Sequence, residues 1–252
     1  MNIIYFSGNG NTKYCMKLLS SALGNGKIES IENENAIQLI KESDEFILAY
    51  PVHFSNIPFI VKDFIQKNSS LFSGKNIFLI ATMGAFSGDG TGCGARLLKK
   101  CGANILGGLH LRMPDTVADV KLLKKSSEEN KAIIKNTEEK ISAISKMLQN
   151  KKYPHEGLHF YNQLAGLFGQ RLWFMKAAKK HRHDFKVAVE KCSGCGLCQK
   201  QCPTRSIQIE NKVAKLTGSS CTICYRCVNS CPKQAITIIG KDIFGQYLFG
   251  KY

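Results

Sequence analysis

A pattern of four cysteines and a proline, present twice, constrains this chain more than any other feature. The spacing C-x2-C-x2-C-x3-C-P occurs at Cys192–Pro203 and again, 29 residues later, at Cys221–Pro232. Residues 186–240 are therefore an internal repeat that holds eight of the 11 cysteines. Cysteines at such short and regular intervals, in a chain that begins without an export signal, indicate metal binding rather than disulfides.

The spacing resembles that of the bacterial ferredoxins with two [4Fe–4S] clusters, in which the fourth cysteine of each copy binds the other cluster. The resemblance implies one cluster on Cys192, Cys195, Cys198 and Cys231, and a second on Cys221, Cys224, Cys227 and Cys202. Zinc is the competing hypothesis, but structural zinc sites take four ligands in pairs. The scattered cysteines are expected to be small buried hydrophobic residues: Cys15, Cys93 and Cys101.

The first 150 residues alternate between strand-like and helix-like segments. Strands are predicted at 2–6, 27–31, 45–50, 75–82 and 104–112. Helices are predicted at 14–23, 56–68, 94–101 and 126–150. Alternating strands and helices predict a parallel sheet covered on both faces. We therefore expect an α/β, doubly wound five-stranded sheet of the flavodoxin-like type, followed by a small α+β ferredoxin-like domain.

Three loops rich in glycine and polar residues follow the first, third and fourth predicted strands. The carboxyl ends of parallel strands lie at one edge of a sheet, so loops 7–12, 51–58 and 83–92 should meet there. The first loop opens a helix, and backbone N–H groups at a helix N-terminus suit a phosphate. An ordinary turn with Asn11 or Thr12 as the helix N-cap is the alternative.

These loops resemble the FMN-binding loops of flavodoxins, with asparagine in place of some hydroxyl residues. The resemblance implies a phosphate site at Ser7, Gly8, Asn9, Gly10, Asn11 and Thr12. It implies flavin-ring contacts from Pro51, Val52, His53 and Phe54, and from Thr82, Met83, Gly84, Ala85, Phe86, Gly88 and Asp89. The alternatives are that Phe54 or Phe86 anchors its loop in the core and that His53 is a solvated loop residue. His53 is otherwise a candidate flavin contact or proton donor.

The complete arrangement, including Met113-Pro114 after the fifth strand, is similar to the EFR1-family ferrodoxins. It implies FMN and two [4Fe–4S] clusters in one polypeptide. We expect an FMN-binding domain at 1–150, a helical connector at 151–185, a ferredoxin-like domain at 186–240 and a C-terminal tail at 241–252. The connector is expected to dock one domain on the other, with contact to a membrane surface as the alternative. Segment 112–125 is either part of a pocket or a plain linker.

The formal charge of +16 invites a nucleic-acid hypothesis. Each oxidised cluster with its four thiolates contributes about −2, and an FMN phosphate removes about two further charges. With these cofactors bound, the protein would still have a net charge of about +10. A basic protein favours an acidic ferredoxin or flavodoxin as its electron donor. No nucleic-acid motif accompanies the lysines. Without a long apolar run or a signal peptide, a cytoplasmic protein with no membrane span is expected.

Three functions remain open at this point. The first is an oxidoreductase that passes electrons from an external one-electron donor through the clusters to FMN and on to a small organic acceptor. The second is a carrier between two proteins, which has no small-molecule substrate. The third is a redox or oxygen sensor, for which the sequence offers no effector domain. The sequence does not identify a catalytic residue, and we expect an anaerobic setting because low-potential clusters are often sensitive to oxygen.

Overall fold

A computed structural model describes residues 1–85, 89–159, 172–218 and 221–250 of the chain. The N-terminal half holds a parallel five-stranded sheet with the order β2-β1-β3-β4-β5, which confirms the predicted doubly wound fold. Its strands are β1 (Asn2–Tyr5), β2 (Ile28–Ser30), β3 (Glu45–Pro51), β4 (Asn76–Met83) and β5 (Asn104–Arg112).

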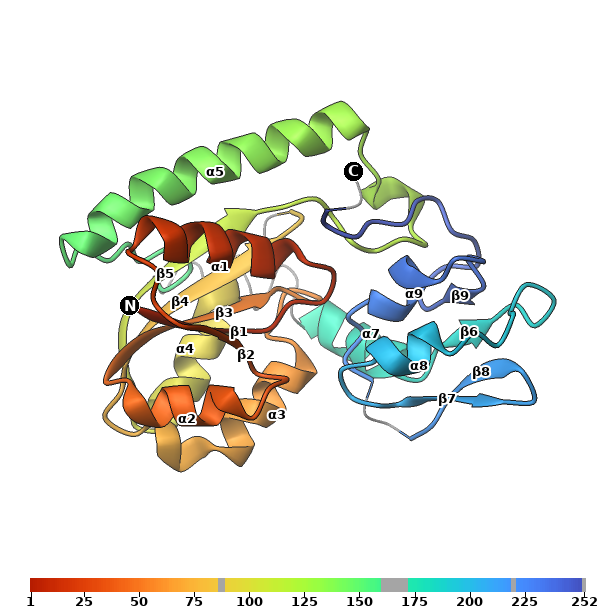
Figure 1. Ribbon diagram of the computed structural model, residues 1–252, viewed down its shortest axis with the longest axis horizontal. Coiled ribbons are helices and arrows are strands. Elements are labelled where there is room, and N and C mark those ends of the chain that lie inside the picture. Colours follow the sequence, from red (N-terminus) through yellow and green to blue (C-terminus); the bar gives the residue numbers. More distant parts are fainter. Residues whose placement is uncertain (86–88, 160–171, 219–220, 251–252) are drawn as a thin grey trace.

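Helices cover both faces of this sheet (Figure 1). On one face lie α1 (Asn11–Ala22) and α5 (Ser127–Gln149), and on the other α2 (Asn35–Glu42), α3 (Phe59–Lys67) and α4 (Gly90–Lys100). Two short 3-10 segments are η1 (Ser69–Phe72) and η2 (Lys121–Leu123). Helix α5 begins with a complete capping box, in which Ser126 and Glu129 satisfy each other's backbone N–H groups.

The structure corrects two details of the predicted elements. Helix α2 was not predicted, although Ala36, Leu39 and Ile40 are buried at helical spacing over its eight residues. Helix α4 begins at Gly90, inside the segment predicted as a glycine-rich loop. Glycine is needed in α4 for close packing, because a Cβ at Gly94 would lie 2.4 Å from the Tyr50 hydroxyl.

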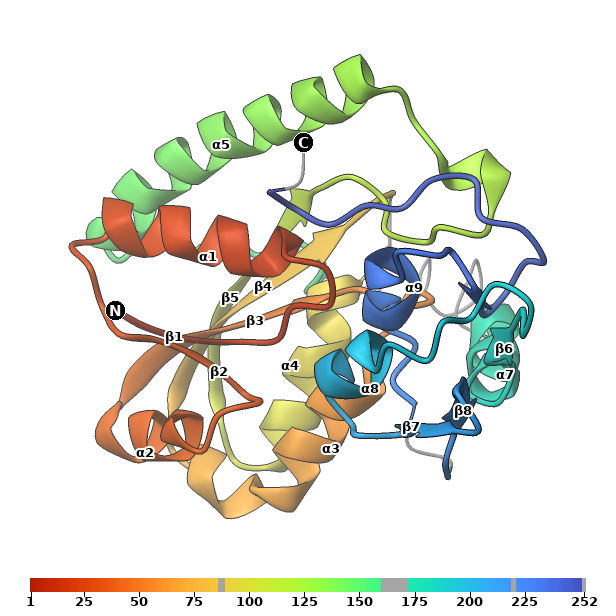
Figure 2. The same cartoon turned by 45° about the vertical axis from the view of Figure 1, so that its right-hand side comes forward.

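The second half contains two short antiparallel sheets and two short helices. Strand β6 (Lys186–Val187) pairs with β9 (Ile236–Thr237), and β7 (Ile207–Glu210) pairs with β8 (Val213–Leu216). The helices are α8 (Leu197–Gln201) and α9 (Arg226–Ser230), and each contains the third cysteine of its repeat. These elements form the expected small α+β unit. Figures 1 and 2 show it at one end of the parallel sheet, with α9 beside the loops that follow the strands.

The connector runs from the sheet to this second unit. Its first part lies beside β5, where Gly108 N–H donates to Pro154 O at 2.7 Å and Glu156 N–H donates to Gly108 O at 2.8 Å. Its last part is helix α7 (Leu172–His181). The predicted connector positions Tyr161, Leu164 and Phe168 lie outside the described residues. Of the described helices, none is long and apolar enough to cross a membrane.

The central strands are buried on both faces, as the continuous apolar runs predict. Leu79 of β4 is fully buried, whereas Leu122 is 92% exposed. Leu79→Ala should lower the free energy of unfolding by about 2–5 kcal/mol, because it leaves a cavity in the core. Leu122→Ala, the matched control, should change it by less than about 0.5 kcal/mol. Urea unfolding followed by circular dichroism measures both, and equal effects would contradict this assignment of the core.

Candidate flavin cavity and cysteine clusters

Loops from four strand ends surround one cavity of about 560 Å³. This volume is within the usual range for cofactor sites. The residues that were predicted to contact FMN and that line this cavity are Ser7, Gly8, Asn9, Asn11, Thr12, Pro51, Val52, His53, Phe54, Thr82, Met83, Gly84 and Ala85. The segment after β5 adds residues 113–117 to the wall. The topology therefore brings together the loops that were predicted to meet.

Two predicted residues, Gly10 and Asp89, do not line the cavity, and two others are not among the described residues. Phe86 and Gly88 lie outside the described residues. Gly10 lies behind the wall, with a φ of 97°, and forms the N-cap of α1. Asp89 is fully buried at the start of α4, where it forms an ion pair with Arg96 at 2.8 Å, and it is not among the residues that line the cavity.

The first loop has the local structure of an anion site. The N-cap residue of α1, Gly10, offers no side chain to the first backbone N–H groups of the helix, and of these the Lys13 N–H is satisfied by Ser7 instead. Ser7 Oγ accepts from the Lys13 N–H at 3.2 Å, and the Thr12 and Thr82 hydroxyls lie 2.8 Å apart. Asn11 donates to Pro114 O at 2.9 Å, while its own side-chain oxygen is buried without a hydrogen-bond partner among the described residues.

That acceptor on Asn11 tests whether FMN fits. A buried polar atom without a partner costs about 1–3 kcal/mol. A hydroxyl from a bound molecule would satisfy it, and FMN carries both hydroxyls and a phosphate. The loop therefore has N–H groups for the phosphate and an acceptor for a hydroxyl, which is a donor and acceptor set that fits FMN.

The second loop is fixed by contacts to the cysteine-rich unit. His53 Nδ1 donates to the Thr222 carbonyl at 3.2 Å, and burial lowers the pKa of His53 to about 4. The imidazole is therefore neutral near pH 7, which argues against an imidazolium as a proton donor. Phe54 has a φ of 49° and stacks on His181 of α7, with ring centroids 5.8 Å apart.

The eight repeat cysteines form two groups of four around two small cavities. The first group is Cys192, Cys195, Cys198 and Cys231, and the second is Cys202, Cys221, Cys224 and Cys227. Each group contains one cysteine from the other copy of the repeat, as the ferredoxin resemblance implies. Among the described residues, no three such side chains converge as one metal ion would require. A [4Fe–4S] cube has no such requirement, because each thiolate binds a different iron.

Burial disfavours the thiolate form of the cysteines in the second group unless a positively charged metal binds them. It raises the pKa of the Cys224 thiol to about 12, and it also raises the pKa of the Cys221 and Cys227 thiols. Thiolates are the metal ligands, so iron must displace these protons when a cluster assembles. Backbone N–H groups of Ser206 and Ile223 donate to the sulfurs of Cys202 and Cys221 at 3.3 and 3.4 Å. Such bonds tune cluster potentials.

The other three cysteines are apart from both groups. Cys15 and Cys93 are buried, as expected of small hydrophobic residues, and Cys101 is half-buried. Burial raises the pKa of Cys15 to about 12.

The family comparisons agree with this geometry. A flavodoxin domain family matches residues 2–100, and a 4Fe–4S dicluster domain family matches residues 185–240. The chain is a fusion of a flavodoxin domain and a 4Fe–4S dicluster domain. This pair of domains makes it an iron–sulfur flavoprotein for electron transfer. The narrower EFR1-family assignment remains a prediction.

Solved structures similar to this fusion protein cover its first domain. The two-electron reduced flavodoxin of Megasphaera elsdenii is 25% identical over 45% of this chain and 88% of its own, with a TM-score of 0.40. A flavodoxin from the domain Archaea is 13% identical over 57% of this chain and 97% of its own, with a TM-score of 0.39. A search of the curated proteins finds no match.

The residues that join the two domains could not be recognised in the sequence. Asp119, Tyr225, Arg226 and Asn229 all bond across the boundary. Their positions in a presumed linker or between cysteines carry no recognisable motif. The segment after β5, which was expected to be either part of a pocket or a plain linker, forms part of the wall of the flavin cavity. Burial raises the pKa of Asp115 in this segment.

The grouping of cysteines leads to a test of ligand exchange. Cys202→Ala and Cys224→Ala should each disrupt the second group, because both residues line the same cavity. After anaerobic reduction the two variants should share one residual electron paramagnetic resonance spectrum, with about half of the iron retained. Cys195→Ala should leave a different spectrum, and the Cys93→Ala control should keep both signals. A Cys202→Ala spectrum that matched Cys195→Ala would contradict the exchange.

Proposed function

We propose that this iron–sulfur flavoprotein takes single electrons from an external donor, passes them through two [4Fe–4S] clusters to FMN, and reduces an organic substrate. The observation that supports this proposal is a shared wall. Ile223 and Tyr225 lie between cysteines of the second group, and both also line the flavin cavity. Tyr225 lines both the flavin cavity and the cavity of the second cysteine group, so the two cavities share a wall residue.

The residues divide into those for the clusters and those for the flavin. The two groups of four cysteines hold one cluster each. The loop at 7–12 holds the FMN phosphate, and the loops at 51–54 and 82–85 hold the ring. FMN, when bound, supplies the change from single electrons to electron pairs. Residues 1–150 and 186–240 are the two domains in this proposal, joined by 151–185 and followed by the tail at 241–252.

A buried aspartate holds Tyr225 in the shared wall. Asp119 is 2% exposed, and its carboxylate accepts the Tyr225 hydroxyl at 2.7 Å. The same carboxylate accepts backbone N–H groups of Ile238 and Ile239 at 2.7 and 2.9 Å. One side chain from the flavodoxin half therefore satisfies three donors of the cysteine-rich half, which fixes the wall and excludes water from it.

An arginine holds the loop at residues 7–12, which we call the phosphate loop, against the second cysteine group. Arg226 lies between Cys224 and Cys227 and donates to Ser7 O at 2.7 Å and to Gly8 O at 2.9 Å. It also forms an ion pair with Glu32 at 2.8 Å. These bonds turn two loop carbonyls away from the cavity, which leaves backbone N–H groups for the phosphate. We assign Arg226 as a positioning residue.

The cavity extends beyond the loops that hold a flavin, and this supports a substrate rather than a carrier function. Val117, Val120, Leu123 and Ala177 add apolar surface to its wall. A second cavity of about 300 Å³ adjoins it and shares Asp115 and Leu123 with it. An electron carrier between proteins has no use for this additional volume.

The hydrogen bonds of Arg226 predict that its replacement affects both FMN binding and the rate of flavin reduction. Arg226→Gln should lower FMN affinity and slow flavin reduction by about tenfold, since losing charged hydrogen bonds costs about 1.5–3 kcal/mol. Arg205→Gln is the matched control, because Arg205 is exposed in the same domain. Fluorescence titration of FMN and stopped-flow absorbance give the two readouts. Equal behaviour of the two variants would show that Arg226 does not position the loop.

The proposal as a whole is tested by anaerobic purification and analysis of iron, sulfide and flavin. About eight irons, eight sulfides and one FMN per chain are expected. Limiting chemical reductant should reduce the clusters and then the flavin, and a panel of organic acceptors should reoxidise the flavin. Eight irons with no flavin, even after FMN is added, would overturn the flavoprotein route. Oxidation by redox proteins but by no organic acceptor would favour the carrier.

A further inference from the structure

The cysteine repeat has two equivalent faces with opposite surroundings. Cys195 and Cys224 are the second cysteines of the two copies. Cys224 is 8% exposed and lies under the phosphate loop, where Asn9 donates to its carbonyl at 2.7 Å and Gly8 packs against it. Cys195 is exposed. One face of the repeat is thus occupied by the flavodoxin domain, while its counterpart faces solvent.

The residues around the two cysteines differ in a way that matches this contrast. Tyr225, Arg226 and Asn229 make the contacts of the covered face. Their counterparts in the first copy are Gly196, Leu197 and Lys200. A Cβ at Gly196 would meet nothing within 4 Å, so the backbone here is open to an approaching molecule. Electron transfer slows steeply with distance, and the absence of a side chain at Gly196 keeps the distance from a docked partner to Cys195 short.

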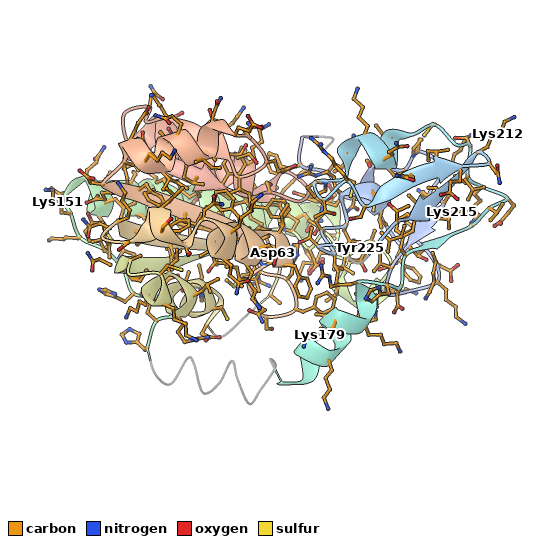
Figure 3. All side chains as sticks on the ribbon, turned by 90° about the horizontal axis from the view of Figure 1, so that it is seen from below. Asp63, Lys151, Lys179, Lys212, Lys215 and Tyr225 are labelled. Carbon is orange, nitrogen blue, oxygen red and sulfur yellow. The ribbon has the colours of Figure 1, made fainter. Side chains whose placement is uncertain are left out.

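Lysines lie next to the first cysteine group: Lys233 lines its cavity, Lys191 directly precedes Cys192, and Lys200 follows Cys198 by two residues. Lys191, Lys200, Lys212 and Lys233 are exposed, and the backbone of Lys212 packs against Gly194 beside Cys195. The acidic residues of 186–240 are Glu190 and Glu210, and Glu210 is paired with Lys215 at 2.8 Å. Figure 3 shows Lys212 and Lys215 at the end of the molecule opposite Lys151, away from the flavodoxin domain.

We propose that the face around Cys195, bordered by Lys191, Lys200, Lys212 and Lys233, is the docking surface for an acidic redox protein that delivers single electrons. This inference rests on the proposed function, in which the first cysteine group holds a [4Fe–4S] cluster. In each encounter the donor loses one electron and that cluster gains it, so two encounters supply an electron pair. Complementary charge raises the rate of such encounters and makes that rate fall with salt.

The test uses anaerobically purified full-length protein and a flavodoxin of net negative charge as the probe. Lys200→Glu, Lys212→Glu and the double variant reverse charge at the face, and Lys151→Glu reverses the same charge at the opposite end. Binding of the oxidised probe is measured by calorimetry, and cluster reduction by the reduced probe is followed by stopped flow. Dithionite, a small reductant with no need of a docking face, serves as the reference donor.

At low salt the double variant should lose at least about tenfold in both probe affinity and reduction rate, while Lys151→Glu changes either by less than about twofold. High salt should remove the difference, and dithionite should reduce the wild-type protein and the four variants at rates within about twofold of one another. Unchanged binding in the double variant, or an equal loss in Lys151→Glu, would overturn the docking surface. If the flavin stayed oxidised in every protein but probe binding by the variants still differed as expected, the proposed electron route to FMN would be overturned. The docking surface would then still be supported.

Discussion

The contact between the phosphate loop and Cys224 is the constraint on which the rest of this molecule depends. A side chain at Gly8 would place its Cβ 2.8 Å from the Cys224 carbonyl, so the loop can approach this cysteine only because Gly8 has none. Asn9 then bonds to the same carbonyl. One loop thus forms a wall of the flavin cavity and covers the second cysteine group, which places the two proposed cofactor sites side by side.

Buried polar side chains keep this contact in place. Asp119 and Asn229 are each 2% exposed, and both have partners in the opposite half of the chain. The C-terminal tail adds to the same junction, because the Phe249 N–H donates to Asn9 O at 2.9 Å. Within the closed junction, the loss of any one partner would leave a buried polar group unsatisfied, which costs about 1–3 kcal/mol, whereas an exposed ion pair contributes about 0–1 kcal/mol.

A nearly symmetric repeat is used here for two different purposes. The copies share their cysteine spacing, and each contributes one cysteine to the other's group. Their outer faces differ because Tyr225 and Arg226 in one copy correspond to Gly196 and Leu197 in the other. A symmetric pair of cysteine groups therefore acquires a direction, with one group joined to the cavity and the other open to a partner.

The sequence by itself determined the two domain types and the parallel sheet, because cysteine spacing and the periodicity of strands and helices are local features. The resemblance to ferredoxins implied how the cysteines group. The sequence also placed the loops of the cavity at one edge, since parallel strands leave no other arrangement. It could not show that Asp119, Arg226 and Asn229 join the domains, because isolated polar residues acquire partners only when distant segments meet. It could not show the ion pair between Asp89 and Arg96 for the same reason. Only the tertiary structure decided which cysteine group faces the cavity, because that choice depends on side chains that break the symmetry of the repeat.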